Sequence, residues 1–467
     1  MTAVVDPTDT TALPLTDLDA ATAGRVLLPG SAEYDALATP WNVAVPCRPV
    51  AVLAATCAAD VQAAVRFAGA HGLEVAVQAT GHGAVPVPRP FLLVQTALLD
   101  ELAIRPDATA RVGAGVRWSR LLEAAAPSGL AGPAGSAPHV GVVGYLTGGG
   151  IGPVARTVGV GSDHVTAFDV VTGDGVLRRA TATENPALFW GLRGGKGTLG
   201  IVTAVELQLQ PLREVFGGCV FFAGEDAASV LHTWRAWTAG LPEQATSSVA
   251  VFRMPPLPGI PEPLAGTVTV ALRFAWVGDP AQGEAALAPM LGAGRIVLGG
   301  MGVLPFAAIG AIHNDPVDPM PTLEASALLR ELPVEAVDAL LALAGPAAGC
   351  PQIMVELRHL GGAVGREPAV AGAFDQRDGQ FALMAIGLAV PPVAAAVRAH
   401  GGALLDALAP WSTGGCLPNF AASADPAEVA RKYGRDTLRR LATLAATYDP
   451  HGVLAAARPV RQACLAL

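Results

Sequence analysis

The sequence predicts an α+β protein built of two lobes. The chain has 467 residues, more than one compact core usually holds, because single domains run to about 100–200 residues. Helical and strand patterns are mixed along it, without the strict alternation that marks a parallel α/β fold. After Pro211 the patterns lengthen, as in a strand expected over residues 267–277 and a helix expected over residues 333–344. We therefore expect a second lobe to begin there.

These changes of pattern define an N-terminal extension, two lobes and a C-terminal segment. The four parts are residues 1–39, 40–212, 213–405 and 406–467. In the first lobe, apolar residues at helical spacing predict a helix over residues 58–70, and Gly72 is placed to end it. Its further expected elements are strands over residues 73–79, 110–116, 164–171, 176–181 and 201–209, a hairpin turn at Asp174-Gly175, and helices that begin near Trp118 and after the capping residue Asn185.

Composition and charge argue against several classes of protein. Hydrophobic residues make up 52% of the chain and charged residues 15%, which favours a globular protein. A net charge of −9 without Lys/Arg clusters argues against a nucleic-acid partner. The apolar run over residues 296–312 is interrupted by Pro305 and by glycines, so we expect buried core or a loop and no membrane helix. No basic segment precedes an apolar one near Asp6 and Asp9, so we expect the protein in the cytoplasm.

Several motifs with known chemistry are absent or incomplete. The 6 cysteines are scattered and the 9 histidines form no close ligand pair, so we expect reduced thiols and no metal site. Residues 195–200 match the dinucleotide pattern G-x-G-x-x-G, but a helix is expected before them and a strand after them, the reverse of what that pattern requires. Lys196 lacks the flanking residues of a phosphate-binding loop.

Two glycine clusters remain, over residues 81–83 and 135–152. The first belongs to a turn, Thr80-Gly81-His82-Gly83, directly after the strand expected over residues 73–79. Consecutive backbone N–H groups in such turns form concavities that bind anions, for example a pyrophosphate. Tight turns without a ligand are the alternative interpretation of this pattern alone.

The segment PVAVLAATCAADVQAAVRFAGAHGLEVAVQATGHG is followed, in this order, by GSAPHVGVVGYLTGGGIG, VVTGDG, LFWGLRGGKGTLGIVTAVE and VELRHLGGAVGR. This series resembles the FAD-linked oxidases of the vanillyl-alcohol-oxidase (PCMH-type) superfamily, in their berberine-bridge-enzyme-like, hydroxynicotine-oxidase-like branch. The resemblance covers residues 40–212, parts of 350–390 and the tail from Asn419 to Val460. It implies a PCMH-type FAD-binding domain of two subdomains, an α+β substrate-binding domain with an antiparallel sheet over residues 213–405, and a C-terminal segment that returns to the FAD domain.

By this resemblance FAD lies against the glycine-rich turns and is covalently attached to His82 through the 8α-methyl group of the flavin. A neutral imidazole is a competent nucleophile, and such a link would raise the potential of the flavin and prevent its loss. The implied cofactor contacts are Thr80, Gly81, His82 and Gly83 in the pyrophosphate loop, then Gly135, Ser136, Gly141, Gly144, Tyr145 and Gly149, with Gly200, Ile201 and Val202 at the adenine end.

Departures from the family's pattern affect the expected site. Ala137 stands where many relatives carry a cysteine that forms a second flavin link, so we expect attachment through His82 alone. Ala457 and Arg458 replace an Asn-His pair in the tail, and Leu438 replaces a tyrosine near the flavin. Contacts from the tail to the flavin ring, and the identity of the catalytic base, therefore stay open.

The candidate catalytic residues are Glu356, His359 and Tyr145, with His139 as a further candidate. A structural role is the alternative for each of them, such as an ion pair between Glu356 and Arg358. In a strand over residues 355–360, Glu356 and Arg358 share one face and His359 lies on the other, so we expect only one of these faces to meet the flavin.

The implied function is oxidation of a small organic molecule in specialised metabolism, such as antibiotic biosynthesis, by hydride transfer to the flavin with O2 as the acceptor. The leucine at position 438 keeps a second possibility open, a non-redox cyclase in which the flavin is a scaffold. A third is a resistance protein that binds a metabolite without converting it. The sequence leaves the substrate and the oligomeric state undetermined.

Overall fold

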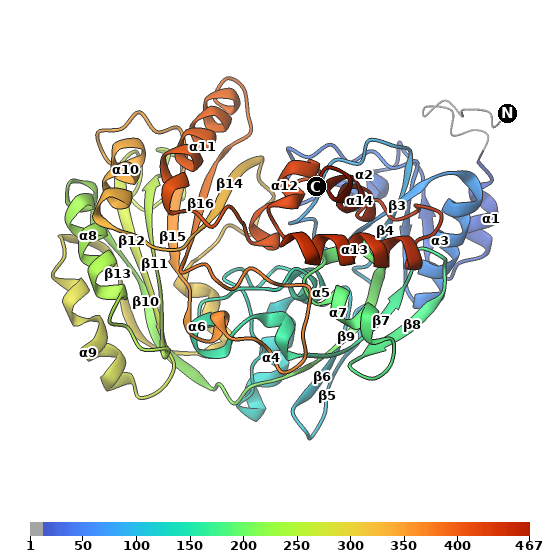
Figure 1. Ribbon diagram of the computed structural model, residues 1–467, viewed down its shortest axis with the longest axis horizontal. Helices are drawn as coiled ribbons and strands as arrows, with labels where there is room; N and C mark the ends of the chain where they lie inside the picture. Colours follow the sequence, from blue (N-terminus) through green and yellow to red (C-terminus); the bar gives the residue numbers. More distant parts are fainter. Residues whose placement is uncertain (1–12) are drawn as a thin grey trace.

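The protein folds around three β-sheets, which confirms the predicted α+β class. The computed structural model describes residues 13–467, so the stretch with Asp6 and Asp9 lies outside the described residues. In Figure 1 the four-stranded and five-stranded sheets lie on one side of the molecule and the seven-stranded sheet lies on the other, while the chain's C-terminal helices return to the first side.

The four-stranded sheet has parallel strands at its centre. Its elements are α1 (Leu15–Ala20), β1 (Arg25–Leu27), α2 (Ala32–Ala38), β2 (Ala51–Ala54), α3 (Ala58–His71), β3 (Glu74–Gln78) and β4 (Phe91–Gln95). Strands β2, β4 and β3 pair in parallel, and β1, which precedes residue 40, pairs antiparallel with β2. Helix α3 ends as predicted, because Gly72 is left-handed (φ 67°) and its N–H bonds to the carbonyl of Ala68.

The five-stranded sheet is antiparallel. Its elements and covering helices are β5 (Leu102–Ile104), β6 (Thr109–Gly113), α4 (Trp118–Ala125), α5 (Val142–Thr147), α6 (Ala155–Val158), β7 (Val165–Val171), β8 (Leu177–Thr181), α7 (Pro186–Leu192) and β9 (Ile201–Gln208). The predicted hairpin joins β7 to β8, with Gly175 at φ 73°. Asn185 precedes α7 as predicted, but the predicted cap is wrong, because its side chain donates to the carbonyl of Arg179 (2.7 Å) on β8.

The seven-stranded sheet is also antiparallel and begins beyond the boundary placed after residue 212. Its elements and helices are β10 (Glu214–Ala223), α8 (Ala227–Thr238), β11 (Ala245–Arg253), β12 (Val268–Trp276), α9 (Pro280–Leu291), β13 (Ile296–Pro305), β14 (Thr322–Leu329), α10 (Val334–Ala344), β15 (Met354–His359), β16 (Phe381–Leu388) and α11 (Ala394–Leu408). Helices α8 to α11 lie on the outer side of this sheet in Figure 1, so its other side faces the rest of the molecule. Trp234 and Phe274 are fully buried in this lobe's core.

Strand β13 corrects the prediction for residues 296–312. It lies at the edge of the seven-stranded sheet and pairs only with β10. Its side chains are half-buried or exposed, as at Val303 (52% exposed), so buried core or a loop is wrong for residues 296–305. An edge strand needs a partner on one side only, which lets an apolar, glycine-rich segment form a strand without being covered. In the part of the chain that the structure describes, no helix combines the length and the apolar character that crossing a membrane requires.

The C-terminal segment packs beside the four-stranded sheet. Its helices are α12 (Pro426–Ala430), α13 (Arg435–Tyr448) and α14 (Ala457–Leu465). The N–H of Val75 on β3 donates to the carbonyl of Val453 (2.7 Å), and the N–H of Ala455 donates to the carbonyl of Val75 (3.0 Å). Arg458 forms an ion pair with the buried Glu74 (2.9 Å), so this departure from the family's pattern serves to hold the tail on β3.

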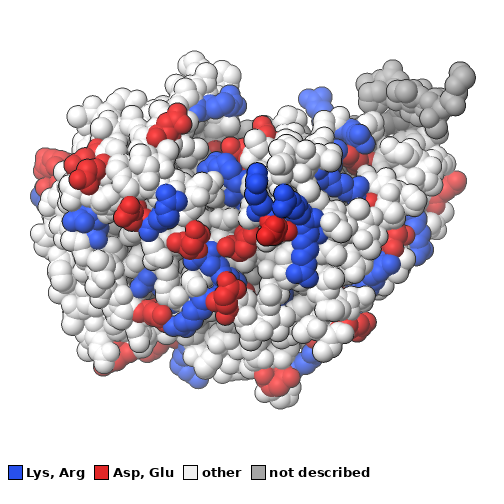
Figure 2. Space-filling model, in the orientation of Figure 1, with Lys and Arg blue, Asp and Glu red and all other residues white. Residues whose placement is uncertain are grey.

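Charged side chains of both signs are mixed on the surface. On the face shown in Figure 2, acidic and basic residues occur together over both lobes, and basic side chains gather near α12 and α13. Helix α13 carries Arg435, Arg439 and Arg440, with Asp436 among them. This view shows no continuous basic surface of the kind that binds a phosphate backbone.

Asp60 connects the chain before β1 to the start of α3. Its carboxylate, 1% exposed, accepts hydrogen bonds from the backbone N–H groups of Ala23 (2.8 Å), Gly24 (3.1 Å) and Thr56 (2.8 Å) and from the hydroxyl of Thr56 (2.9 Å). Buried donors left without an acceptor cost about 1–3 kcal/mol each. This one side chain therefore holds several segments of the first lobe together.

Replacing Asp60 by alanine is expected to lower the free energy of unfolding by about 3 kcal/mol, because the buried N–H of Gly24 and the part-buried N–H groups of Ala23 and Thr56 lose their acceptor. Urea denaturation of the purified variant measures this change. The matched control is Asp406→Ala, at an exposed position of α11, with an expected change of less than about 0.5 kcal/mol. Equal stability of the two variants would contradict the role assigned to Asp60.

Candidate active site

The turn after β3 holds His82 against the segment that precedes β2. The hydroxyl of Thr80 lies 2.9 Å from Nδ1 of His82. The imidazole stacks on the indole of Trp41, with ring centroids 4.8 Å apart. Gly81 has φ 76°, and a Cβ there would lie 2.6 Å from Cα of Pro40, so a larger residue could not make this approach. The imidazole therefore has one defined orientation.

His82 is neutral and incompletely hydrogen-bonded. Its Nε2 is buried and has no partner among the described residues. The ring of His139 lies beside it, with centroids 4.9 Å apart. Burial, followed by the effects of His139 and Arg117, lowers the pKa of His82 to about 3. The imidazole is therefore unprotonated at pH 7, the form in which it acts as a nucleophile.

The other predicted cofactor glycines differ in their surroundings. A Cβ on Gly83 or on Gly144 would meet no atom within 4 Å, and Gly141 has a single neighbour at ordinary contact distance. Gly149, with φ 91°, packs against the ring of Phe374. Gly83, Gly144 and Gly141 therefore leave open space next to their backbone, whereas Gly149 allows close packing against Phe374.

Tyr145 lies on α5 with its hydroxyl buried and without a partner among the described residues. Its ring lies edge-on to Trp118, with centroids 5.3 Å apart, and a Cβ on Gly135 would lie 2.8 Å from it. Burial raises the pKa of Tyr145 well above its usual range, so the phenol stays protonated at pH 7. Gly135 thus serves to seat this ring.

The residues predicted at the adenine end pack within the five-stranded sheet. Ile201 is paired with Val171 and Val202 with Val170, and the side chains of both residues are buried. A Cβ on Gly200 would lie 2.6 Å from the side chain of Val170. No hydrogen bond in the described chain joins this stretch directly to His82.

Glu356 lies on β15 between two arginines of the same sheet. Its carboxylate accepts hydrogen bonds from Arg273 (2.6 Å), Arg358 (2.7 Å) and the hydroxyl of Ser248 (2.8 Å), and Glu356 is fully buried. Burial alone would raise the pKa of this carboxyl, but Arg358 and Arg273 outweigh it and hold the pKa well below its usual range. Glu356 is therefore a fixed negative charge and a poor proton acceptor.

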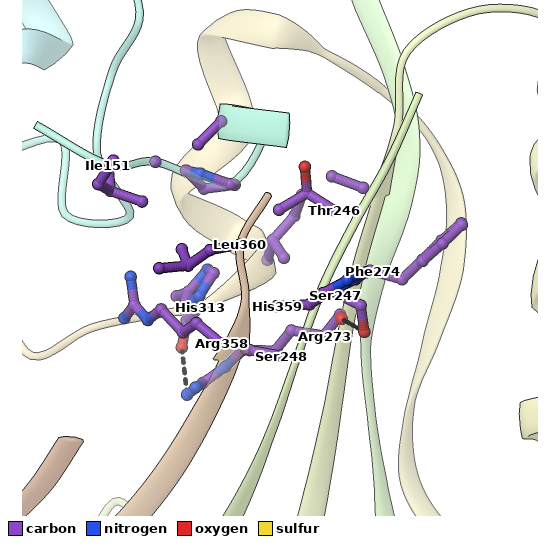
Figure 3. A pocket seen from close by; sticks show the side chains of 15 residues that line it. Ile151, Thr246, Ser247, Ser248, Arg273, Phe274, His313, Arg358, His359 and Leu360 are labelled. Carbon is purple, nitrogen blue, oxygen red and sulfur yellow. Dashed lines mark hydrogen bonds between the residues drawn. The ribbon is translucent and has the colours of Figure 1, made fainter. Parts of the chain in front are cut away.

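The end of β15 meets residues of the first lobe at a cavity, which Figure 3 shows from close by. Its lining residues are Ile151, Gly152, Pro153 and Ala155 from the first lobe and Thr246, Ser247, Ser248, Arg273, Phe274, Ala275, Ile312, His313, Arg358, His359 and Leu360 from the second. Arg358 and His359 alternate along β15, yet both line the cavity. The expectation that only one face of the strand contributes does not hold for this cavity.

His313 is the most buried imidazole of the cavity. Both of its ring nitrogens are buried without a partner in the described chain, and its Nε2 lies 3.8 Å from Oε1 of Glu356. Burial, followed by the charges of Arg273 and Arg358, lowers the pKa of His313 to about 3. A neutral imidazole with a free acceptor nitrogen therefore faces this space.

Arg156, on α6, joins the two lobes. Its guanidinium donates to the carbonyls of Ala245 (2.8 Å) and Leu241 (3.0 Å), to the carbonyl of Leu360, and to Nε2 of His359 (3.1 Å). Arginine nitrogens only donate, so Nε2 of His359 accepts and the proton of this imidazole is on Nδ1, which has no partner among residues 13–467. Burial, followed by the charge of Arg156, lowers the pKa of His359 to about 3.

A second connection between the lobes runs through Ser136. Its hydroxyl donates to the carboxylate of Asp315 (2.6 Å), which follows His313 in the chain by two residues. Asp315 acts electrostatically on His139, beside His82, and also on Arg358. Ser136 therefore lies between the two groups of candidate residues and binds to the second lobe.

Sequence analysis missed several residues of this region. Lys196 is left-handed (φ 57°), and its ammonium contacts the side-chain oxygen of Asn419, whose amide donates to the carbonyl of Tyr145 (2.9 Å). Burial lowers the pKa of Lys196 to about 7. No short motif marks His313 or Trp41, because their neighbours come from distant parts of the chain.

The surroundings of His82 fit a bound cofactor. Buried polar groups are normally hydrogen-bonded, and the unpartnered Nε2 of His82 and hydroxyl of Tyr145 are exceptions within the described residues. The open glycines Gly83 and Gly144 provide backbone that a ligand can approach closely. His82, Thr80 and these glycines are the residues that would hold a flavin nucleotide.

Comparison with known proteins supports this assignment. Residues 49–181, which include His82 and Tyr145, match the family described as FAD binding domain. The fold matches that of BBE-like 1 from Physcomitrella patens with a TM-score of 0.82 (19% identity, 94% of this chain and 97% of that chain). Residues 49–181 thus match an FAD-binding segment, and the chain has the berberine-bridge-enzyme-like fold, in agreement with the resemblance seen in the sequence.

Individual relatives match only part of the chain. The chain is 32% identical to (R)-6-hydroxynicotine oxidase of Paenarthrobacter nicotinovorans over 208 residues, 43% of this chain and 44% of that protein. It is 37% identical to FAD-linked oxidoreductase easE of Arthroderma benhamiae over 199 residues, 39% of each. The chain thus spans less than half the length of these relatives. The structure of 6-hydroxy-D-nicotine oxidase from Arthrobacter nicotinovorans has a TM-score of 0.77 (24% identity, 93% of this chain and 96% of that chain).

The buried histidines predict an acid-sensitive fold. His313 and His359 have pKa values of about 3 in the folded chain and an ordinary value of 6.5 when unfolded. Below pH 6.5 the unfolded chain binds protons that the folded chain does not. The free energy of unfolding is therefore unaffected by these two histidines above pH 6.5, and they lower it as the pH falls toward 3. In this range each of the two histidines adds about 1.4 kcal/mol per pH unit to the slope of the free energy of unfolding against pH.

Replacing His313 by asparagine is expected to lower the slope of the free energy of unfolding against pH, between about pH 6 and pH 4.5, by the amount that one bound proton contributes. Urea denaturation at several pH values measures the slope. His451→Asn, at an exposed position after α13, is the control and should leave the slope unchanged. An unchanged slope in the His313 variant would show that this imidazole is not held neutral by the fold.

Proposed function

We propose that the protein is an FAD-dependent oxidase that removes two hydrogens from a small organic molecule and passes the electrons to O2, which becomes hydrogen peroxide. The observation that carries the proposal is His82, a neutral buried imidazole with an unpartnered nitrogen inside the segment that matches the FAD binding domain. Relatives of that segment are named as an oxidase and an oxidoreductase, which supports the reaction class.

FAD, when bound, supplies the hydride acceptor and the route of the electrons to O2. The chain has to hold the cofactor, orient the substrate and take up a proton. We assign the first task to His82, Thr80 and the glycines with open space before them. The cavity at the end of β15 has the polar groups for the second task.

We infer that the cofactor is covalently attached through His82. Thr80 and Trp41 hold the ring, and the low pKa keeps it unprotonated. With FAD held there, the bond would join a ring nitrogen of His82 to the 8α-methyl carbon, and O2 would take up the two protons and two electrons that its formation releases. Ala137 offers no sulfur for a second bond, so the attachment is single.

We propose that His313 orients the substrate by accepting a hydrogen bond from it. Tyr145 is held protonated, Glu356 is held ionised by two arginines, and Nε2 of His359 already accepts from Arg156. Among these groups only His313 is neutral with a free acceptor nitrogen. Glu356, 3.8 Å away, would stabilise positive charge that develops on this imidazole.

A non-redox cyclase and a metabolite-binding resistance protein make different predictions. Anaerobic addition of a substrate bleaches the flavin of an oxidase. A cyclase forms product without bleaching, and a binding protein does neither while it binds the ligand. Leu438, which stands where many relatives carry a tyrosine, is fully buried against Trp190 and Tyr433 on α13's inner side, so its replacement serves packing.

Replacing His82 by alanine is expected to abolish flavin that survives denaturation, because no other residue of the turn offers a nucleophilic ring nitrogen. Acid precipitation of the purified protein, followed by absorbance of pellet and supernatant, measures attachment, and the intact mass should fall by one FAD.

His139→Ala is the matched control for this experiment, because His139 lies beside His82 but is not assigned to the bond. Its pellet should stay yellow. Yellow colour in the precipitated His82 variant would refute the assignment, whether or not the protein still binds FAD.

A further inference from the structure

We infer that the cavity at the end of β15 recognises the carboxylate of an acidic substrate, and that Arg358 is the residue that binds it. The inference rests on the proposed function, since it assigns a substrate class to the same site. Four features carry it: the charge balance of the cavity, its unused donors, the rigidity of Arg358 and the position of the cavity beside the cofactor segment.

Within ion-pair distance, the cavity has two arginines and one carboxylate. Arg273 and Arg358 each form an ion pair with Glu356, and no other carboxylate of the described residues lies within 4 Å of either guanidinium. All three residues are at least nine-tenths buried, with exposures of 3%, 9% and 0%. Asp315 is the next acidic group that acts on Arg358, and its carboxylate is already bonded to Ser136 (2.6 Å). Buried charge is costly unless it is paired, so an anionic ligand would complete this cluster.

The donors of the cavity exceed its acceptors. Arg358 uses Nε for Glu356 (2.7 Å), and its two terminal nitrogens have no hydrogen bond to any described residue. Figure 3 shows the guanidinium of Arg358 apart from that of Arg273. Nε of Arg273 and Nδ1 of His359 are buried without a partner in the described chain. Arginine nitrogens cannot accept, so the ligand has to bring acceptors, and the two parallel N–H groups of a guanidinium match the two oxygens of a carboxylate.

The guanidinium of Arg358 is held in place before any ligand binds. Glu356 fixes one edge of it, and the ring of Phe420 lies 5.0 Å from its centre. A preorganised donor pair binds an anion without the cost of ordering a flexible side chain. Arg358 is thus built as a binding group and not as a surface charge.

The cavity lies where a substrate would meet the cofactor. Ile151 and Gly152 line it, and they follow Gly149 and Gly150 of the glycine cluster directly in the chain. Phe420, against Arg358, is adjacent to Asn419, which donates to the carbonyl of Tyr145 (2.9 Å). Phe274, Ile312 and Leu360 are among the lining residues, so the arginines lie beside an apolar wall.

The test compares acids with neutral analogues of the same shape. Acetate, benzoate and phenylacetate, each paired with its amide, are titrated into the purified protein and followed by calorimetry and by the visible spectrum of the flavin. At least one acid is expected to bind about tenfold or more tightly than its amide, and Arg358→Met should remove this preference without weakening amide binding, since a hydrogen bond to a charged group is worth about 1.5–3 kcal/mol. Arg439→Met, at an exposed position on α13, is the matched control and should bind like the wild type.

A second variant protects the test against misfolding, because Arg358→Met leaves Glu356 with one cation fewer. The double variant Glu356→Gln/Arg358→Met removes both charges of the pair and should also lose the preference for acids. Glu356→Gln alone removes only the competing anion and should bind the acid more tightly than the wild type. Equal affinity for acids and amides, or an Arg358 variant that still prefers acids, would overturn the inference. A protein purified without flavin would instead contradict the proposed function, and calorimetry would still report on the carboxylate site.

Discussion

The position of the candidate site depends on one buried guanidinium, that of Arg156. It donates hydrogen bonds to four carbonyls and to His359 across the junction of the lobes, and it forms no ion pair with a carboxylate of the described residues. A buried cation without a counter-ion is costly, so it persists only where acceptors converge on it. The carbonyls of Ala245 and Leu360 meet this requirement, and this contact brings the end of the glycine cluster against strands β11 and β15. The cavity beside β15 follows from this contact.

Around that junction, polar atoms without partners gather in one region of the molecule. Among the described residues they include Nε2 of His82, the hydroxyl of Tyr145, both nitrogens of His313 and Nδ1 of His359. Burial keeps the three histidines neutral, with pKa values of about 3. Buried polar groups without a hydrogen-bond partner lower the stability of the fold unless a ligand supplies the partner. A flavin beside His82 and an acidic substrate beside Arg358 would supply the missing hydrogen-bond partners. Binding of these ligands would therefore offset the stability that the unpartnered groups cost the free protein.

Local patterns in the sequence predicted many elements correctly. The helix over residues 58–70 ended at Gly72 because glycine adopts the left-handed conformation of the C-cap without strain, and Asp174-Gly175 formed the hairpin that its turn chemistry favours. Predictions that depended on partners were less accurate. Residues 296–305 became an exposed edge strand because they pair with β10, and Asn185 bonded to β8 instead of capping α7.

The sequence by itself determined the class of the protein, the FAD-binding segment and His82 as the residue on which the proposed attachment depends, because turn glycines and ordered motifs act over short distances along the chain. Only the tertiary structure decided what surrounds those residues. Trp41 stacks on His82 from another segment, and His313, from the segment between β13 and β14, lies 3.8 Å from Glu356 on β15. It also showed that Glu356 is a fixed charge between two arginines and not a free base. Proton affinity depends on burial and on neighbouring charges in space, and neither quantity can be obtained from spacing along the chain.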